Sequence, residues 1–523
     1  MELGNYKKEA IRLVSITSFS GILIKFMSLP LSIINAHILG PSLLGSLRIF
    51  DLVRGYVNYN SFGLLQAMTR QIPISMGKKD DKESEYLQDN IFSANVITMG
   101  FSLVVLWILF LSGINFKGIF NYVRLTILTA TLILVRIDSY LNCYMKSVGA
   151  FSVIARQTVI VSWVSPFLLV SLVILRNLDG ALLAGMIIHI IGIAIFITGT
   201  KVYMPRWRLE WHRIKELSSV GIKVFVNRVA ENIFLTIDTT IIAFLLLPEQ
   251  LGLFSFAWGI TALSFSLTSM LTTMISRHML HVRGKYGLQN GLGFLRKYLE
   301  NPLTGYITLN TIFIVSLCFG CIVIVKLFLP KYLGALPCLL ILGLGQVFFT
   351  ASYIPSFSME VIDQMERRFL ITVGALVFNG ILDFVLIRAG YGIVGAAWAS
   401  TISFIMYGVI IITLVRYQAF NSIIEPVKYI LKITSITLAT FLLLYILQHR
   451  PIISFLNYEE FYLKVIMGLV DTIIKCVLVS MFVLISYVFT FRQDGLYQEF
   501  LKIFTYFLSY IRGVIPALRY NIK

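Results

Sequence analysis

Charged side chains are scarce in this 523-residue chain, and no long polar segment separates its apolar runs. Charged residues make up 13% of the sequence and hydrophobic residues 57%, with a mean hydropathy of +0.83. So few charges cannot cover the surface of a water-soluble globule of this size. Apolar runs of about 20 residues recur along the chain and predict an all-α, polytopic membrane protein, because a helix satisfies its own backbone hydrogen bonds in lipid.

Motifs for catalysis and metal binding are also missing. Cys318 and Cys321 lack a second ligand pair, so the five cysteines are expected to be free thiols in apolar surroundings. Phosphate-binding glycine loops, metal-ligand spacings and nucleophile elbows are not evident in the sequence. His37 and His189 are isolated, which favours packing or a local hydrogen bond over a metal ligand or a proton relay. The sequence therefore predicts a protein that is not an enzyme and has no catalytic residues or bound metal.

The positive charge is distributed unevenly between the loops. The apolar runs predict fourteen spans, near 10–38, 44–69, 89–113, 122–145, 153–175, 179–201, 219–247, 250–275, 303–329, 333–355, 367–388, 391–415, 426–448 and 463–490. With these spans, 29 of the 44 Lys and Arg lie in the N-terminus, the even-numbered loops and the tail, and 7 lie in the other loops. The positive-inside rule then places both termini in the cytoplasm. The net charge of +18 is thus a topology signal, and no nucleic-acid partner is expected.

A Pro-x-x-Leu-Gly pattern occurs twice, at 41–45 and at 248–252, and each copy sits between two long apolar runs. The pattern aligns Gly45 with Gly252, and further weak matches follow at nearly the same offset. Two parallel copies of a six-helix unit are a common way to build a transporter. We therefore expect an N-terminal lobe, a cytoplasmic linker, a C-terminal lobe, two appended spans and an amphipathic cytoplasmic tail, at 1–203, 204–218, 219–416, 417–491 and 492–523.

Polar side chains within the predicted spans form stripes on helix faces. Ionisable residues are costly in lipid, so they indicate a cavity or an ion pair. In span seven the stripe carries charges of both signs and covers about 80° of the helix. A guanidinium fork matches phosphate oxygens, and an ammonium group attracts them as a point charge. The candidate residues for binding an anionic headgroup are Lys25, Arg48, Arg54, Asn58, Lys223, Asn227 and Arg228.

The acidic members of these stripes allow two interpretations. A buried carboxylate readily changes its protonation state, so Asp51, Glu231 and Asp238 are candidates for coupling to H⁺ or Na⁺. Alternatively, these charges neutralise basic neighbours, because Asp51 lies three residues from both Arg48 and Arg54. Asp471 and Lys475, four residues apart, are expected to form such a self-neutralising pair, whereas Arg136 and Asp138 are expected to point to different faces.

Segments 37–45, 61–68, 237–252 and 391–397 together resemble the polysaccharide-transport family (Wzx-type O-antigen and capsule flippases) of the multidrug/oligosaccharidyl-lipid/polysaccharide (MOP) superfamily. The resemblance extends through twelve predicted spans. It implies a V-shaped, two-lobed bundle in the bacterial cytoplasmic (inner) membrane. Such a bundle would move an undecaprenyl-pyrophosphate-linked oligosaccharide (an O-antigen, capsule or exopolysaccharide repeat unit) to the outer leaflet by alternating access. Implied partners besides this lipid-linked oligosaccharide are membrane lipids and polysaccharide polymerase and chain-length proteins.

The cationic cavity site of related flippases is matched only in part by this sequence. Lipid II flippases of this superfamily use cavity arginines on their first, second and eighth helices. Lys25, Arg48 and Arg54 lie in the first two regions, but span eight has no basic residue before Arg277. Lys223 or Arg228 on span seven would have to substitute, which favours an O-unit or capsule-type cargo over lipid II.

Two other functions remain open at this point. A cation-coupled multidrug exporter of the same superfamily should have an acidic cavity, whereas these spans contain several Lys and Arg. A membrane glycosyltransferase or polysaccharide polymerase needs a carboxylate constellation in an external loop. Glu459 and Glu460 are the candidates for that role.

Overall fold

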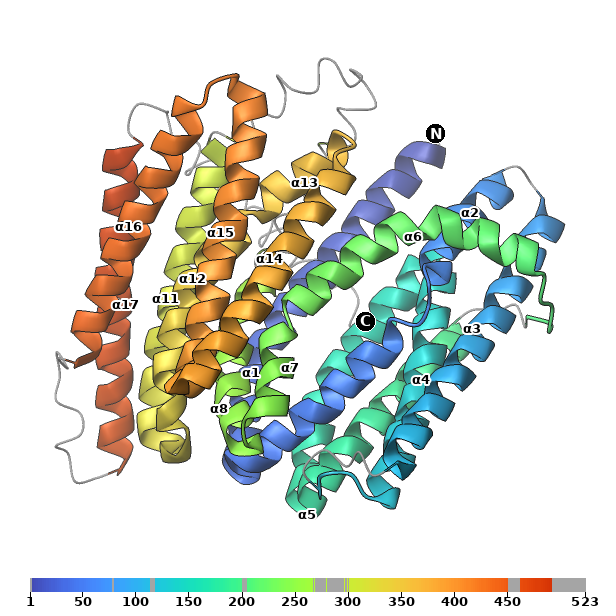
Figure 1. Cartoon of the computed structure of the whole chain (residues 1–523), viewed down its shortest axis with the longest axis horizontal. Coiled ribbons are helices and arrows are strands. Elements are labelled where there is room, and N and C mark those ends of the chain that lie inside the picture. Colours follow the sequence, from blue (N-terminus) through green and yellow to red (C-terminus); the bar gives the residue numbers. More distant parts are fainter. Residues whose placement is uncertain are drawn as a thin grey trace. The chain divides into compact units, whose positions relative to one another are not determined.

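The computed structural model describes residues 2–77, 80–112, 118–199, 205–266, 301–449 and 461–491, and the single residues 268, 279, 296 and 299. Side chains are described from residue 30 onward, except at a few helical positions that include Arg70 and Lys223. Every regular element in these residues is a helix (Figure 1). Nine of the described helical stretches are long and apolar enough to cross a membrane. The all-α, polytopic membrane fold is therefore confirmed, while the count of fourteen spans stays a prediction.

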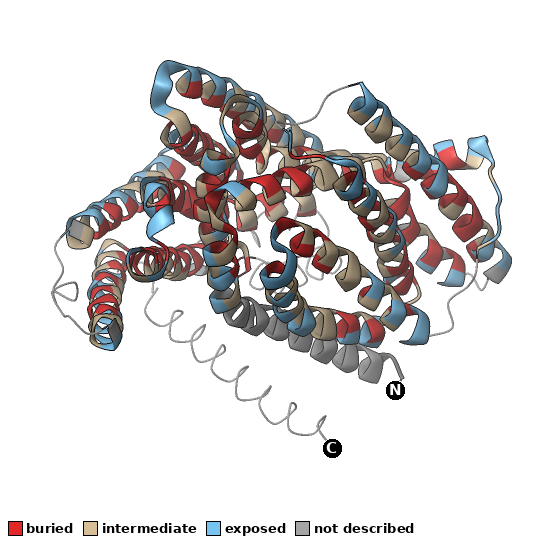
Figure 2. Ribbon diagram, turned by 90° about the horizontal axis from the view of Figure 1, so that it is seen from below, coloured by how far each residue is buried: buried red, intermediate tan, exposed pale blue. Residues whose placement is uncertain are grey.

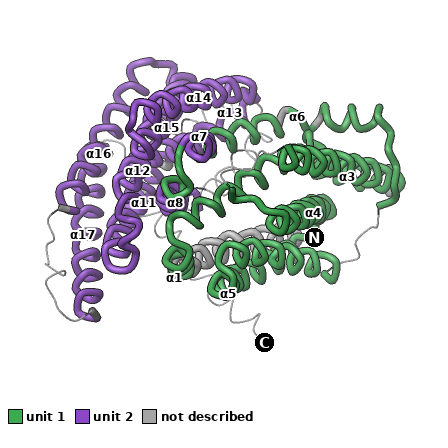
Figure 3. Tube along the Cα trace, turned by 60° about the horizontal axis from the view of Figure 1, so that its bottom comes forward, with its two compact units in different colours: residues 1–236, 246–252 green, residues 237–245, 253–523 purple. Residues whose placement is uncertain are grey.

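The chain divides into two compact units (Figure 3). Unit 1 comprises residues 1–236 and 246–252, and unit 2 comprises 237–245 and 253–523. The change of unit at 236–237 falls inside predicted span seven rather than in the predicted linker at 204–218. The predicted tail at 492–523 lies outside the described residues.

Six helices form unit 1: α1 (Glu2–Asn58), α2 (Leu64–Gly77), α3 (Asp81–Leu111), α4 (Tyr122–Ser147), α5 (Phe151–Gly199) and α6 (Trp211–Phe234). Two of them are broken where predicted spans meet. Gly40 has φ 66° in α1 and Asn177 has φ 49° in α5. Glycine adopts this left-handed conformation without a steric penalty, and asparagine adopts it more readily than most residues. Spans one and two, and spans five and six, therefore follow each other with almost no loop.

Unit 2 contains α7 (Ile237–Leu245), most of α8 (Pro248–Thr261), and the helices α11 (Asn301–Phe328), η2 (Pro330–Ala335), α12 (Leu336–Ala351), α13 (Tyr353–Val361), α14 (Met365–Leu386), η3 (Ile387–Tyr391), α15 (Gly392–Phe420), α16 (Ile424–His449) and α17 (Phe461–Thr490). The appended helix α17 packs on α11. The Nζ of Lys475 lies 2.7 Å from Oδ2 of Asp471, and both side chains are buried. The predicted self-neutralising pair is therefore confirmed.

Apolar side chains lie on both the inside and the outside of the two units. The core of unit 1 includes Met68, Ile72 and Ile91, which are completely buried. Many large apolar side chains are exposed instead, for example Leu175 at 74% and Phe489 at 70%. In Figure 2 buried residues lie on the helix faces that meet other helices, and exposed residues lie on the opposite faces. A surface this apolar is expected for helices that face lipid.

Candidate functional site

The repeated Pro-x-x-Leu-Gly motif forms a reciprocal backbone contact in unit 1. A Cβ added to Gly45 would lie 1.8 Å from the carbonyl oxygen of Pro248. A Cβ added to Gly252 would lie 1.8 Å from the carbonyl oxygen of Pro41. Only glycine permits so close an approach of two backbones. The two copies of the motif therefore touch each other with near two-fold symmetry, which explains why both contain the glycine.

A second glycine pair joins α6 to the start of α2. A Cβ on Gly221 would lie 2.1 Å from the carbonyl oxygen of Gly63, and a Cβ on Gly63 would lie 2.8 Å from the carbonyl carbon of Gly221. Gly63 also has φ 79°, a conformation that other residues rarely adopt. The N-terminal part of predicted span seven is thus held in unit 1.

On α1, two of the predicted site residues form an ion pair. Nη2 of Arg54 lies 2.8 Å from Oδ1 of Asp51, so the neutralising interpretation holds for this pair. The Arg54 side chain is nevertheless 37% exposed, which leaves part of the guanidinium accessible. Arg48 is half-buried, and its Nε has no hydrogen-bond partner among the residues that the structure describes.

The other predicted headgroup residues are placed less closely together. Asn58 is half-buried at the end of α1, Asn227 is half-buried on α6, and Arg228 is exposed. The side chains of Lys25 and Lys223 lie outside the described part of the chain. The structure therefore brings Arg54 and Asp51 together and leaves the remaining set as a prediction.

Arg136 is a structural residue of unit 1. It is 4% exposed, and its guanidinium donates to the carbonyl oxygens of Asn58 and Asn60, at 3.2 and 2.9 Å, and to Oγ1 of Thr98 at 3.1 Å. Asp138 contacts His189 instead, at 3.0 Å, so the prediction that Arg136 and Asp138 point to different faces is confirmed. The local hydrogen bond expected for His189 is confirmed as well.

We expect Arg136→Ala to lower the free energy of unfolding by about 3 kcal/mol, because two carbonyl groups lose charge-assisted hydrogen bonds from a buried guanidinium. Thermal unfolding in detergent measures the change. Arg156→Ala is the control, because Arg156 is exposed on α5. Equal stability of the two variants would contradict this role.

Unit 2 contains a buried acidic cluster. Nδ2 of Asn379 on α14 donates to Oδ1 of Asp238 on α7, at 2.5 Å. Asp383, one turn further along α14, is completely buried and interacts with Asp238 electrostatically. Apart from that interaction, both carboxylate oxygens of Asp383 have no hydrogen-bond partner in the described residues. Ser400 on α15 is also completely buried and interacts with Asp238.

Two adjacent buried carboxyl groups cannot both carry an uncompensated negative charge, so either one of them is protonated or a metal cation lies between them. The cluster can therefore hold a shared proton or a metal cation. Asp238 was predicted from the sequence, but Asp383 and Asn379 were missed. Their i,i+4 spacing was the available signal, because it places both on one face of α14. Glu231, the other predicted coupling residue of span seven, is half-buried on α6 in unit 1, whereas Asp238 belongs to unit 2.

The segment 205–210 is bound to α3 through its backbone. The backbone N–H groups of Arg206, Arg208 and Glu210 donate to Asp89, Ser93 and Asn90, at 2.7, 2.9 and 2.9 Å. Each of the three acceptor side chains is buried. Every second backbone N–H from 206 to 210 is therefore bound by a side chain of α3, which holds this part of the predicted linker along α3 in unit 1.

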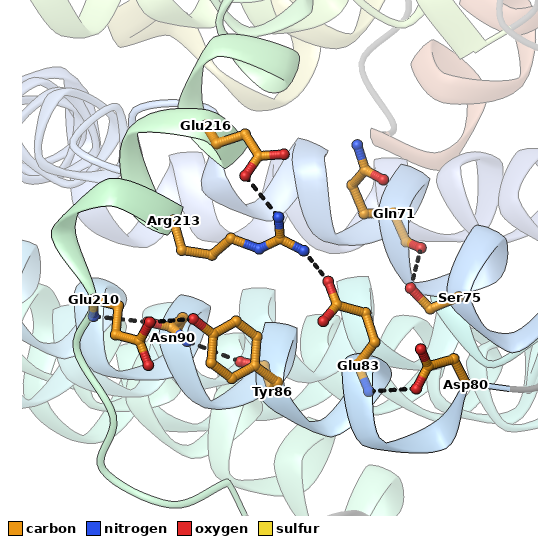
Figure 4. Close-up of polar contacts among 9 residues, drawn as sticks. All are labelled: Gln71, Ser75, Asp80, Glu83, Tyr86, Asn90, Glu210, Arg213 and Glu216. Atoms are coloured by element: carbon orange, nitrogen blue, oxygen red, sulfur yellow. Dashed lines mark hydrogen bonds and ion pairs between the residues drawn. The ribbon is translucent and has the colours of Figure 1, made fainter.

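Side chains around this segment add a charged network (Figure 4). Arg213 lies between Glu83 and Glu216, and Tyr86 donates to Glu210. The hydrogen bond from Tyr86, followed by that from Arg208, lowers the pKa of Glu210. A lowered pKa means that the contribution of this carboxylate to stability is present above its unfolded pKa and is lost as the pH falls through the folded value.

Comparisons with known proteins agree with the resemblance found in the sequence. Residues 72–285 match the family model described as "Polysaccharide biosynthesis protein". A comparison with curated proteins gave no match. Among solved structures, the lipid II flippase MurJ in an inward closed conformation is 16% identical with a TM-score of 0.55, and the match covers 87% of this chain and 97% of that chain.

Two further structures extend the comparison. A MOP superfamily transporter from Pyrococcus furiosus, described as having a binding pocket of reversed polarity, has a TM-score of 0.57 at 15% identity, covering 79% of this chain and 96% of that one. An inward-facing multidrug resistance MATE family transporter has a TM-score of 0.53 at 11% identity, covering 75% and 94%. The chain therefore has the fold of MOP superfamily transporters. The predicted resemblance is therefore confirmed for the fold, and residues 72–285 match the model of a polysaccharide-biosynthesis family.

Proposed function

We propose that this protein is a flippase that moves an undecaprenyl-pyrophosphate-linked oligosaccharide from the cytoplasmic to the outer leaflet of the bacterial cytoplasmic membrane. The observation that carries the proposal is a polysaccharide-biosynthesis family match on a transporter fold whose spans contain basic side chains. Both termini are proposed to be cytoplasmic. Alternating access of two lobes would carry the headgroup across the membrane while the lipid tail stays in the bilayer.

The headgroup needs a polar path. Transferring an isolated charged group into hydrocarbon costs roughly tens of kcal/mol. Arg54 would provide such a path in unit 1, because part of its guanidinium remains accessible beside Asp51. The other proposed headgroup contacts are Lys25, Arg48, Asn58, Lys223, Asn227 and Arg228.

The acidic cluster of Asp238 and Asp383 supports coupling to a cation. Burial of two neighbouring carboxyl groups favours binding of H⁺ or Na⁺, and loss of that ion would leave uncompensated charge. Asn379 adds an amide oxygen that can bind Na⁺. We propose this cluster as the coupling site in preference to Asp51, which Arg54 already neutralises.

Reconstituted liposomes test the proposal. Wild-type protein is expected to translocate a polyprenyl-pyrophosphate-linked oligosaccharide. Arg54→Ala and Lys25→Ala are each expected to slow the rate about tenfold, since a hydrogen bond to a charged group contributes about 1.5–3 kcal/mol. The double variant Asp51→Ala/Arg54→Ala excludes an effect of the unpaired carboxylate, and Arg156→Ala is the control on an exposed arginine.

The same assay separates a second candidate. MATE transporters share the fold, so export of organic cations is the competing function. Ion-driven export of such cations without transport of any lipid-linked sugar would overturn the flippase proposal. Transport that is unaffected by Arg54→Ala and Lys25→Ala would retain the flippase and reject the proposed headgroup contacts.

A further inference from the structure

His189 and Asp138 form a half-buried titratable pair within unit 1. Nδ1 of His189 on α5 lies 3.0 Å from Oδ2 of Asp138 on α4. The two side chains are 22% and 20% exposed, so neither is sealed in the core. Both lie in stretches that are apolar enough to cross a membrane. An ionisable pair at such a position usually belongs to an ion or proton path, because placing it in lipid is costly.

The pair continues a polar stripe that begins at Arg54. On α5, Gly185 and His189 are four residues apart and share one helix face. Nη1 of Arg54 lies against Gly185, 3.9 Å from the position of an added Cβ. His189 thus follows Arg54 one helical turn further along α5.

The other end of the stripe is closed by an amide. Gly192, one turn beyond His189, faces Nε2 of Gln157 and Oδ1 of Asp138, which lie 3.0 and 3.3 Å from an added Cβ. Oδ1 of Asp138 is buried and has no hydrogen-bond partner among the described residues. Because Gly192 has no side chain, it leaves room for these two polar groups beside a helix that is otherwise mostly apolar.

An apolar contact between α1 and α5 precedes the stripe. Leu39, Leu43 and Leu47 of α1 pack with Val173 and Ala181 of α5. Steps of three and four residues from Leu47 lead to Asp51 and Arg54, so the same face of α1 turns polar where it passes Gly185.

The charges that meet this stripe are few. Two helices, α1 and α4, pack extensively on α5. From α1 the stripe meets Arg54, which is paired with Asp51, and from α4 it meets Asp138. With His189 neutral, these side chains carry one net negative charge, and protonation of His189 cancels it. The other titratable or charged residues described on the three helices are His37, Arg48, Tyr56, Tyr122, Arg124, Arg136, Tyr140, Cys143, Tyr144, Lys146, Arg156, Arg176 and Asp179.

We propose that His189 and Asp138 form a proton-binding site, and that protonation of His189 strengthens the binding of an anionic headgroup beside Arg54. The second part rests on the proposed flippase function. With its Nδ1–H donated to the carboxylate, the imidazole takes the incoming proton from water on Nε2. Asp138 stabilises the resulting imidazolium, and the added positive charge lies one helical turn from Arg54.

Proton binding is tested first, without any cargo. NMR spectra of protein with ¹³C- and ¹⁵N-labelled histidine, in lipid nanodiscs, report the charge of each of the six His side chains. His189→Gln identifies the signal of His189, which is expected to become that of an imidazolium when the sample is acidified. Asp138→Asn is expected to reduce the imidazolium fraction of this signal in the acidified sample, and the control His212→Gln, on an exposed histidine, leaves it unchanged. A signal that never becomes that of an imidazolium, or an imidazolium fraction unaffected by Asp138→Asn, overturns the site.

Headgroup coupling is tested with geranyl pyrophosphate, a soluble isoprenoid pyrophosphate. The ratio of its affinities for wild type and His189→Gln is expected to rise about fivefold from pH 8 to pH 5.5, the effect of one charge several ångströms away. His212→Gln should follow wild type at every pH. A ratio that is constant with pH overturns the coupling. Failure of the probe to bind at any pH would instead count against the proposed function, while the NMR titration still decides the proton site.

Discussion

Gly45→Ala and Gly252→Ala are each expected to lower the free energy of unfolding by about 1–3 kcal/mol, the usual cost of forcing extra atoms into a packed contact. In each variant the new Cβ would lie 1.8 Å from a carbonyl oxygen of the other copy of the motif, so the backbones must separate. Thermal unfolding of the purified protein measures the change.

Matched controls exist on the same two helices. Gly55 on α1 and Gly259 on α8 have open space where a Cβ would be placed. Alanine at these positions is expected to be neutral or to stabilise by up to about 1 kcal/mol, because alanine is the better helix former. If all four alanine variants were equally stable, the reciprocal contact would not contribute to the fold.

Asp383→Asn is expected to raise the stability of the ion-free protein and to abolish its response to the coupling ion. The substitution removes one of two buried carboxyl groups that otherwise need a shared proton or cation. A ligand that binds only the folded state stabilises wild type by about 2.7 kcal/mol at one hundred times its dissociation constant. Unfolding temperatures measured across Na⁺ concentration and pH distinguish the two ions.

Two variants complete this test. Asn379→Asp adds a third carboxyl group and is expected to destabilise the ion-free protein and to strengthen its response to cations. Asp363→Asn is the control, because Asp363 lies between α13 and α14, outside the cluster. Wild-type stability that is independent of both Na⁺ and pH would show that Asp238 and Asp383 hold no exchangeable ion.

The helical membrane fold could be read from the sequence, because long apolar runs have few structures available to them in lipid. Local pairs were equally predictable. Asp471 and Lys475 lie four residues apart, so helix geometry alone brings them together. The repeated Pro-x-x-Leu-Gly motif also showed that Gly45 and Gly252 are equivalent positions.

The sequence by itself therefore determined the class of fold, the local ion pairs and the internal repeat. Tertiary structure decided everything that depends on contacts between distant segments. The partner of Asp238 lies 145 residues away at Asp383, and that of His189 lies 51 residues away at Asp138, so no local pattern reveals either pair. Buried side chains of α3 also bind the backbone of 205–210, a contact between distant segments that the sequence does not reveal. Helix periodicity determines which residues share a face, whereas tertiary packing determines which other helix that face contacts.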